Sequence, residues 1–171
     1  MEYQAYAPLT YTANKAGLTN GTTTTFSFTA NPLQYVINGK FYSKATQTNT
    51  ATPTTDGNTG VAFLPVPAGS ASACYGCAFV WGYDAGGNVK VYQGPITALT
   101  TIAADGANCA FGLAPAFPSV PGSVVPFGYS IVKVGSSGAA FTMGSTSLAS
   151  GSNISVAHQD VSTLPDRPQV A

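Results

Sequence analysis

Tyr35-Val36-Ile37-Asn38-Gly39-Lys40-Phe41-Tyr42 is the stretch of this 171-residue chain that carries the clearest signal of local structure. Two short runs of apolar and aromatic residues flank Asn38-Gly39, the dipeptide best suited to the positive φ angles of a type I′ turn. The stretch therefore predicts a tight β-hairpin, and with it a fold built from antiparallel strands.

Two further hairpins follow from the same kind of pattern. One joins residues 77–83 to residues 88–93 across a glycine-rich turn, with apolar and polar side chains alternating along the second strand. The other joins 127–134 to 139–143 through a turn of glycine and serine. A last strand is predicted over 153–157.

The composition of the whole chain also favours strands. It is rich in Thr and aromatic residues, contains 19 Gly and 12 Pro, and has a single glutamate, Glu2. Thr and aromatic side chains suit the pleated surface of a sheet, while Gly and Pro interrupt it with turns. Charged helix formers are scarce. Short strands about ten residues apart predict an all-β fold, an antiparallel domain of the sandwich or barrel type.

We expect one β domain, at 26–159, with extended ends. Residues 1–25 are polar and rich in Tyr and Thr, which predicts an extended N-terminal arm, and 160–171 predict an extended C-terminal tail. The proline-rich segment 114–126 is either a linker between two lobes or a crossing stiffened by proline. A single domain is preferred, because a chain of this length suits one well-buried core.

Charged residues are scarce. Only 7% of the residues are charged, with six basic and six acidic side chains, against roughly 25% in ordinary soluble domains. A surface with so little charge, and no net charge, favours association with other protein surfaces. The balance also argues against nucleic acid as a partner, since binding needs a positive surface to neutralise phosphates.

Targeting signals are also missing from the sequence. The N-terminal residues contain no basic region followed by an apolar run, so we expect synthesis in the cytoplasm rather than export. The uncharged stretch 106–132 contains four prolines, which exclude a simple membrane-spanning helix. We therefore expect no membrane partner.

Cys74, Cys77, Cys109 and the single histidine, His158, are the candidate metal ligands. The first two form a Cys-x-x-Cys pair, but the other two lack the paired spacing of a structural zinc site. A redox site of the thioredoxin type would place the pair at a helix N-terminus, and no helix is evident. The pattern favours free or partly buried thiols, with no metal and no cofactor.

No catalytic arrangement is evident, so we expect that the protein is not an enzyme. His158 would have to serve any Ser-His-Asp triad, yet Asp160 lies only two residues away and no Gly-x-Ser-x-Gly turn occurs. Asp56, Asp84 and Asp105 lie beside or near glycines, a context that favours turns over paired-carboxylate catalysis.

Aromatic residues supply the remaining candidates. Trp81, Tyr83 and Tyr92 share one predicted hairpin, where they would either pack in the core or stack on sugars as a carbohydrate-binding platform. Candidates for a protein interface lie in or beside the two ends of the chain. They are Tyr3, Tyr6, Tyr11, Phe26, Phe28, Leu164 and Arg167.

Together these patterns resemble small structural proteins of tailed bacteriophages, and most of all their head decoration (cement) proteins. The resemblance covers most of the chain and rests on pattern and composition, without a mechanistic motif. The segments that carry it are Tyr35–Tyr42, Val89–Ile96, Pro126–Tyr129, Phe141–Leu148 and Leu164–Pro168.

The resemblance implies a β-rich oligomer that binds the major capsid protein on the capsid exterior of the virion and stabilises the head without catalysis. Because such oligomers are usually cyclic, we expect a homotrimer, made in the host cytoplasm. Two alternatives stay open at this point. One is a tail, baseplate or fibre-associated virion component, and the other is a carbohydrate-binding or adhesin β-sandwich.

Overall fold

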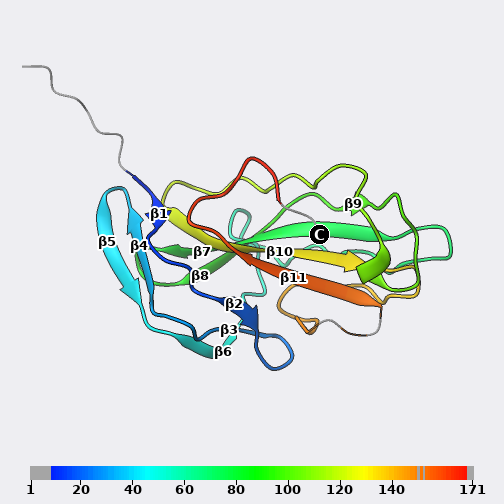
Figure 1. Cartoon of the computed structure of the whole chain (residues 1–171), viewed down its shortest axis with the longest axis horizontal. Helices are drawn as coiled ribbons and strands as arrows, with labels where there is room; N and C mark the ends of the chain where they lie inside the picture. The colour runs from blue at the N-terminus through cyan, green and yellow to red at the C-terminus, as the bar shows by residue number, and fades with distance from the viewer. Residues whose placement is uncertain (1–8, 150, 152, 169–171) are drawn as a thin grey trace, which may run out of the picture.

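The chain folds into three antiparallel β-sheets (Figure 1). A computed structural model describes residues 9–149, 151 and 153–168. The largest sheet, called here the central sheet, has the order β11 (Ile154–Asp160), β10 (Val124–Val134), β7 (Tyr75–Asp84) and β8 (Val89–Gln93), with the short β9 (Thr97–Ala98) paired to the start of β7. No sheet among the described residues closes into a barrel. The prediction of an all-β antiparallel fold is confirmed, and the barrel form is not adopted.

Two three-stranded sheets pack on the inner face of the central sheet. One has the order β1 (Tyr11–Thr12), β4 (Leu33–Ile37) and β5 (Lys40–Lys44), and the other has β2 (Leu18–Asn20), β3 (Thr25–Phe28) and β6 (Gln47–Ala51). A short 3-10 turn, η1 (Gly106–Asn108), follows β9. The described residues include no helix with the length and hydrophobicity needed to cross a bilayer.

Strand β7 is buried on both faces. Its side chains at Phe79, Trp81 and Tyr83 point into the inner core, while Ala78 and Val80 point to the outer side. A strand that is covered on both faces needs an unbroken apolar run rather than alternation, and this strand has one.

Aromatic rings join the layers across the inner core. The ring centroid of Trp81 lies 5.1 Å from that of Phe26 in β3. The ring of Tyr83 lies 5.9 Å from Tyr35 in β4, and the planes of the two rings are nearly parallel. Each pair adds a directional contact to the burial of large apolar surfaces, so both small sheets are held by the same strand of the central sheet.

A β-bulge in β10 changes which residues face the inner core. Residues 126 and 128 pair with consecutive residues of β7, so Phe127 is an extra residue. Val125 faces the inner core before the bulge and Val132 does so after it, which means that the inward positions change from odd to even numbers. Pro126 is tolerated in this central strand because a bulge interrupts the ladder at that point.

The first two predicted hairpins are confirmed. Strands β4 and β5 pair around Asn38 and Gly39, whose φ angles of 51° and 78° suit a type I′ turn. Strands β7 and β8 pair around residues 84–88, where the backbone N–H of Gly87 donates to the carbonyl of Asp84 at 3.0 Å.

The third predicted hairpin, between 127–134 and 139–143, is wrong. Strand β10 pairs with β7 and with β11, whose range contains most of the last predicted strand. Residues 139–143 leave the sheet, and Phe141 and Met143 are fully buried in the inner core. Burial of these two side chains removes more apolar surface from water than a hairpin strand with one solvent face would.

Both ends of the described chain belong to the domain. Residues 9–25, expected to form an arm, contribute β1 and β2 and bury Leu18 in the inner core. Residues 160–168, expected as an extended tail, lie against the same domain, where the hydroxyl of Thr12 donates to the carbonyl of Val161 at 2.7 Å. The backbone N–H of Thr12 also donates to the carbonyl of Ser162. The two ends of the described chain therefore satisfy each other's backbone hydrogen-bonding groups.

The segment 114–126 crosses the outer face of the central sheet. Phe117 and Val120 pack there against an apolar cluster that includes Tyr92 and Tyr129, and the ring centroids of Phe117 and Tyr129 are 5.0 Å apart. The segment therefore covers a sheet face that would otherwise expose apolar side chains to water.

Replacement of Asp160 by alanine is expected to loosen β2 from the central sheet. One carboxylate oxygen of Asp160 accepts hydrogen bonds from the backbone N–H groups of Gly17 and Leu18, each at 3.0 Å. We expect the free energy of unfolding to fall by about 1–2 kcal/mol, with faster hydrogen exchange at these two amides. The exposed Asp166→Ala variant is the control, and equal exchange rates in the two variants would contradict this role.

Candidate functional site

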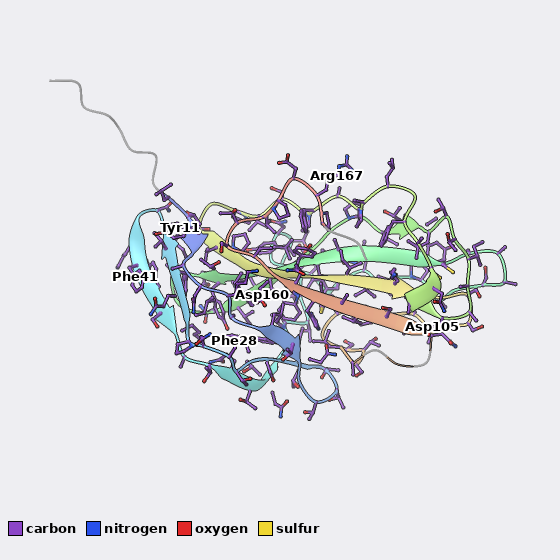
Figure 2. The ribbon with its side chains drawn as sticks, viewed as in Figure 1. Tyr11, Phe28, Phe41, Asp105, Asp160 and Arg167 are labelled. Carbon is purple, nitrogen blue, oxygen red and sulfur yellow. The ribbon has the colours of Figure 1, made fainter. Side chains whose placement is uncertain are left out.

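The outer surface of the β1–β4–β5 sheet carries a row of apolar side chains across all three strands. Tyr11 pairs with Val36, and Val36 pairs with Phe41, so the three side chains share one face. Tyr11 is 36% exposed and Phe41 is 58% exposed, while Val36 between them is 8% exposed. Figure 2 shows Tyr11 and Phe41 at the same end of the molecule. We call these three residues the aromatic row.

The paired residues that share this face with the aromatic row are uncharged. Gln34 and Ser43 lie beside it, and both are polar without charge. Lys40 and Lys44 have the opposite parity on β5, so they lie on the other face of the sheet, and Nζ of Lys44 donates to the carbonyl of Gly87 at 2.8 Å. An exposed apolar patch of this kind is typical of a contact surface for another protein.

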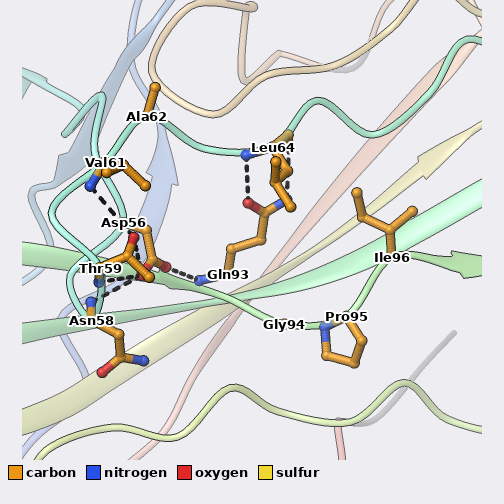
Figure 3. A pocket seen from close by; sticks show the side chains of 10 residues that line it. All are labelled: Asp56, Asn58, Thr59, Val61, Ala62, Leu64, Gln93, Gly94, Pro95 and Ile96. Carbon is orange, nitrogen blue, oxygen red and sulfur yellow. Dashed lines mark hydrogen bonds between the residues drawn. The ribbon is translucent and has the colours of Figure 1, made fainter.

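A second apolar feature is a depression of about 460 Å³ beside the end of β8, which we call the rim pocket. Two segments form it, 56–64 and 93–96 (Figure 3). Val61 and Leu64 are mostly exposed at its edge, together with Pro95.

The polar side chains of the rim pocket are used in hydrogen bonds within the chain. One oxygen of Asp56 accepts from the backbone N–H groups of Asn58 and Thr59, and the other accepts from the backbone N–H of Gln93 at 2.8 Å. The amide of Gln93 pairs with both backbone groups of Leu64, as Figure 3 shows. The pocket therefore offers a neighbour apolar contact rather than polar groups for a substrate.

The aromatic row and the rim pocket lie toward opposite ends of β8. The sheet that carries the aromatic row contacts the turn before β8, where the hydroxyl of Tyr35 donates to the carbonyl of Asp84 at 3.4 Å. The rim pocket lies beside residues 93–96, at and just after the last residue of β8. The chain thus presents two separate apolar surfaces.

The four candidate zinc ligands are not brought together. The sulfur atoms of Cys74 and Cys109 are 2.8 Å apart, but Cys77 belongs to the inner core and donates to the carbonyl of Gly94 at 3.1 Å. Residues three apart on an extended chain point to opposite faces, which separates the Cys-x-x-Cys pair. Within the described residues no three potential ligands cluster, and the three cysteines are buried free thiols.

His158 closes a chain of hydrogen bonds across β7, β10, β11 and β2. The indole N–H of Trp81 donates to the hydroxyl oxygen of Ser130 at 2.7 Å. Since an indole is only a donor, the hydroxyl hydrogen is directed to Nδ1 of His158, also at 2.7 Å. The remaining ring hydrogen on Nε2 then donates to the side-chain oxygen of Asn20. This order of donors requires a neutral imidazole.

The Ser130–His158 contact has a structural role. Ser130 is fully buried, and its oxygen already accepts the indole hydrogen, so it cannot meet a substrate as a nucleophile would. Burial lowers the pKa of His158 to about 4, while the nearby charge of Asp160 acts weakly in the opposite direction. The pair fastens β10 to β11 inside the layers.

The predicted turn roles of the three aspartates are confirmed. Asp84 accepts from the backbone N–H of Gly86 at 2.9 Å, and Asp105 accepts from that of Ala107 at 3.0 Å at the start of η1. Asp56 organises the turn beside the rim pocket in the same way. These carboxylates lie in separate turns and form no catalytic pair.

Two of the predicted interface residues are in the core. Phe26 and Phe28 are fully buried, because β3 packs their rings against Trp81 and Phe127. They cannot form the surface that the sequence pattern assigned to them. Tyr11, in the aromatic row, does lie on an exposed apolar surface.

The other predicted interface residues contact the chain itself or lie outside the described residues. Leu164 packs against the outer apolar cluster, and Nη1 of Arg167 donates to the carbonyl of Ala114 at 3.0 Å. Tyr3 and Tyr6 fall among the residues that the structure does not describe.

The aromatic platform considered for sugar binding does not form on this hairpin. Trp81, Tyr83 and Tyr92 are each at most 1% exposed. Trp81 and Tyr83 lie in the inner core, and Tyr92 lies in the outer apolar cluster beneath the 114–126 crossing. These three residues therefore pack in the core, which was the other role that the sequence allowed.

Sequence reasoning did not find Val36 and Phe41 or the rim pocket. The two-residue turn at 38–39 sets the register of β4 and β5, so the sequence did contain the signal that Val36 and Phe41 share a face. Which face is exposed depends on the packing of the sheet. The rim pocket has no sequence signal, because its two segments are distant in the chain.

Comparison of the chain with protein-family models, with curated proteins and with solved structures found no match.

Acidification is expected to destabilise the fold through His158. Burial lowers its pKa from 6.5 to about 4, so the unfolded chain takes up a proton at a higher pH than the folded chain does. The free energy of unfolding should therefore fall by about 2–3 kcal/mol as the pH drops from about 6.5 to about 4. Chemical denaturation at a series of pH values measures this slope.

The control for this prediction is His158→Gln, which removes the titration. Asp84 also has a lowered pKa, because hydrogen bonds from Asn88 and Gly86 outweigh its burial, but its stabilising effect is lost only below the usual range of a carboxyl group. An equally steep slope in the variant and the wild type between pH 6.5 and 4 would refute the assignment.

Proposed function

We propose that the protein is a non-enzymatic structural component of a virion, a decoration protein that binds the major capsid protein on the outside of a tailed-bacteriophage head. The observation that carries this proposal is the aromatic row, in which Tyr11 and Phe41 are exposed on either side of the buried Val36, on a sheet face whose paired residues are uncharged. An isolated monomer gains nothing from exposing Phe41 to water, whereas an assembled one removes it from water at every contact.

The scarcity of charge supports an assembled state. A charged side chain that enters an interface loses its hydration at a cost of several kcal/mol unless it finds a partner. A neutral face of tyrosine, valine and phenylalanine avoids this cost at each repeated contact of a shell. Tyrosine also keeps a hydrogen-bonding hydroxyl at the edge of such a contact.

Two separate apolar surfaces suit a protein with two kinds of neighbour. In this proposal the aromatic row lies at the three-fold axis of a homotrimer, where the same residues of three copies can meet. The rim pocket receives an apolar segment of the major capsid protein. A decoration protein needs both contacts, one to its own oligomer and one to the shell.

The polar groups of the domain support a role without catalysis, cofactor, nucleic acid or membrane. Ser130 and His158 are engaged in the buried hydrogen-bond chain from Trp81, and Asp56, Asp84 and Asp105 are engaged in turns. The three thiols are free, as expected for a protein made in a host cytoplasm.

Cryo-electron microscopy of native particles from a culture that produces the protein tests the proposal. We expect density for the three-sheet domain at regular positions outside the major capsid shell. Density in the tail, baseplate or fibres would assign the protein to that part of the virion and refute the head location. Absence from every particle would refute the virion role, and retention by glycans would then favour the adhesin alternative.

Phe41→Asp is expected to weaken self-association. The substitution places an unpaired charge at the most exposed side chain of the proposed contact, and we expect the dissociation constant of the oligomer to rise by at least about tenfold. Sedimentation equilibrium over a range of concentrations measures the change. Phe41 is exposed, so the domain should unfold at an unchanged denaturant concentration.

Thr48→Asp is the matched control, since Thr48 is exposed on β6 of the other small sheet, away from the aromatic row, and it should leave self-association unchanged. A second variant, Leu64→Asp at the rim pocket, should leave the oligomer intact and lower the occupancy of the protein on capsids. A Phe41→Asp oligomer as stable as the wild type would exclude the aromatic row as the self-association surface.

A further inference from the structure

Cys74 and Cys109 form a sulfur pair at the end of the domain near β9 and η1. Their Sγ atoms are 2.8 Å apart, with the thiol of Cys109 donating to that of Cys74. The two residues are buried beside Leu99. A disulfide bond needs only a further approach of roughly 0.8 Å, because its S–S length is about 2.05 Å.

The backbone already holds both cysteines in this position. The backbone N–H of Leu99 donates to the carbonyl of Cys74 at 2.9 Å, and that of Cys109 donates to the carbonyl of Gly106 at 3.1 Å. Nζ of Lys133 in β10 donates to the carbonyl of Cys109 at 3.1 Å. These hydrogen bonds hold the backbone of each cysteine in place while the two sulfur atoms face each other.

We propose that Cys74 and Cys109 are a site of reversible oxidation, at which an intramolecular disulfide forms when the protein meets a small-molecule disulfide such as oxidised glutathione. In the first step one protein thiolate attacks the reagent and releases one glutathione thiolate, leaving a mixed disulfide. In the second step the other protein thiolate displaces the second glutathione. Two protein thiols are oxidised, one glutathione disulfide is reduced to two glutathione molecules, and the protons balance.

Cys77 is excluded from this pair by the same geometry that separates the Cys-x-x-Cys motif. Its thiol lies in the inner core and donates to the carbonyl of Gly94, on the other side of β7 from Cys74. Burial raises the pKa of Cys77 to about 12, and burial together with the neighbouring Cys74 also raises the pKa of Cys109, so the position of the sulfur atoms rather than thiolate content singles out the pair. The odd cysteine of the chain is therefore Cys77.

The disulfide would lock an exposed loop to the central sheet. Most of residues 100–110 are exposed, and the loop returns to the domain through backbone hydrogen bonds such as that from Gly106 to the carbonyl of Asn153. Both thiols are buried, so reaction in the folded protein requires that this loop open to admit the reagent. Once formed, the bond between residues 35 positions apart restricts the unfolded chain and keeps the loop closed.

Equilibration of the purified protein with oxidised glutathione, followed by intact-mass measurement and non-reducing peptide mapping, tests the inference. We expect the loss of two hydrogen atoms and a cross-linked peptide pair that contains Cys74 and Cys109. The melting temperature should rise by roughly 5–10 °C and return to its original value on reduction. The test does not depend on the proposed virion function, since it uses the isolated chain.

Three variants define the site. Cys77→Ser, which keeps a hydrogen-bond donor toward Gly94, should form the cross-link as the wild type does, and Cys74→Ala and Cys109→Ala should not. A parallel sample of Cys77→Ser is refolded from denaturant in the same glutathione buffer, so that the reagent can reach Cys74 and Cys109 before they become buried. Absence of the cross-link after refolding, or a stable mixed disulfide with glutathione in its place, would overturn the inference.

Discussion

The burial of β7 on both faces is the constraint on which the rest of the domain depends. Trp81 and Tyr83 hold the rings of β3 and β4 on the inner side, and Ala78 and Val80 support the crossing segment on the outer side. A strand of this kind cannot alternate polar and apolar residues. Its apolar surface leaves water only when the small sheets cover its inner face and the crossing segment covers its outer face. Strand β7 thus contacts every layer of the domain, and contacts from β10 and β11 add to it.

The bulge at Phe127 lets β10 serve both cores. Without the extra residue, the inward positions of β10 would stay odd along its whole length, and Ser130 would face away from Trp81. With it, the hydroxyl of Ser130 reaches the indole and links it to His158. One inserted residue therefore decides which side chains form the hydrogen-bonded link between the sheets.

The few charges of the chain fasten its loops rather than cover its surface. Aspartates accept backbone N–H groups in turns and between β2 and β11, while Lys44 and Arg167 donate to backbone carbonyls. Charges engaged in this way add little to surface hydration. The exterior therefore carries little charge, and the aromatic row and the rim pocket expose apolar side chains on it.

The sequence by itself determined the local structure of this protein. The turn at Asn38-Gly39 and the turn roles of the aspartates depend on φ preferences and on hydrogen bonds a few residues long, and both were predicted. Part of the aromatic row was implied as well, because the hairpin register sets its facing residues. Only the tertiary structure decided that Phe26 is buried, that Cys74 meets Cys109 and that β10 pairs with β11. These outcomes depend on which distant surfaces remove the most apolar area from water together, and no local preference encodes that choice.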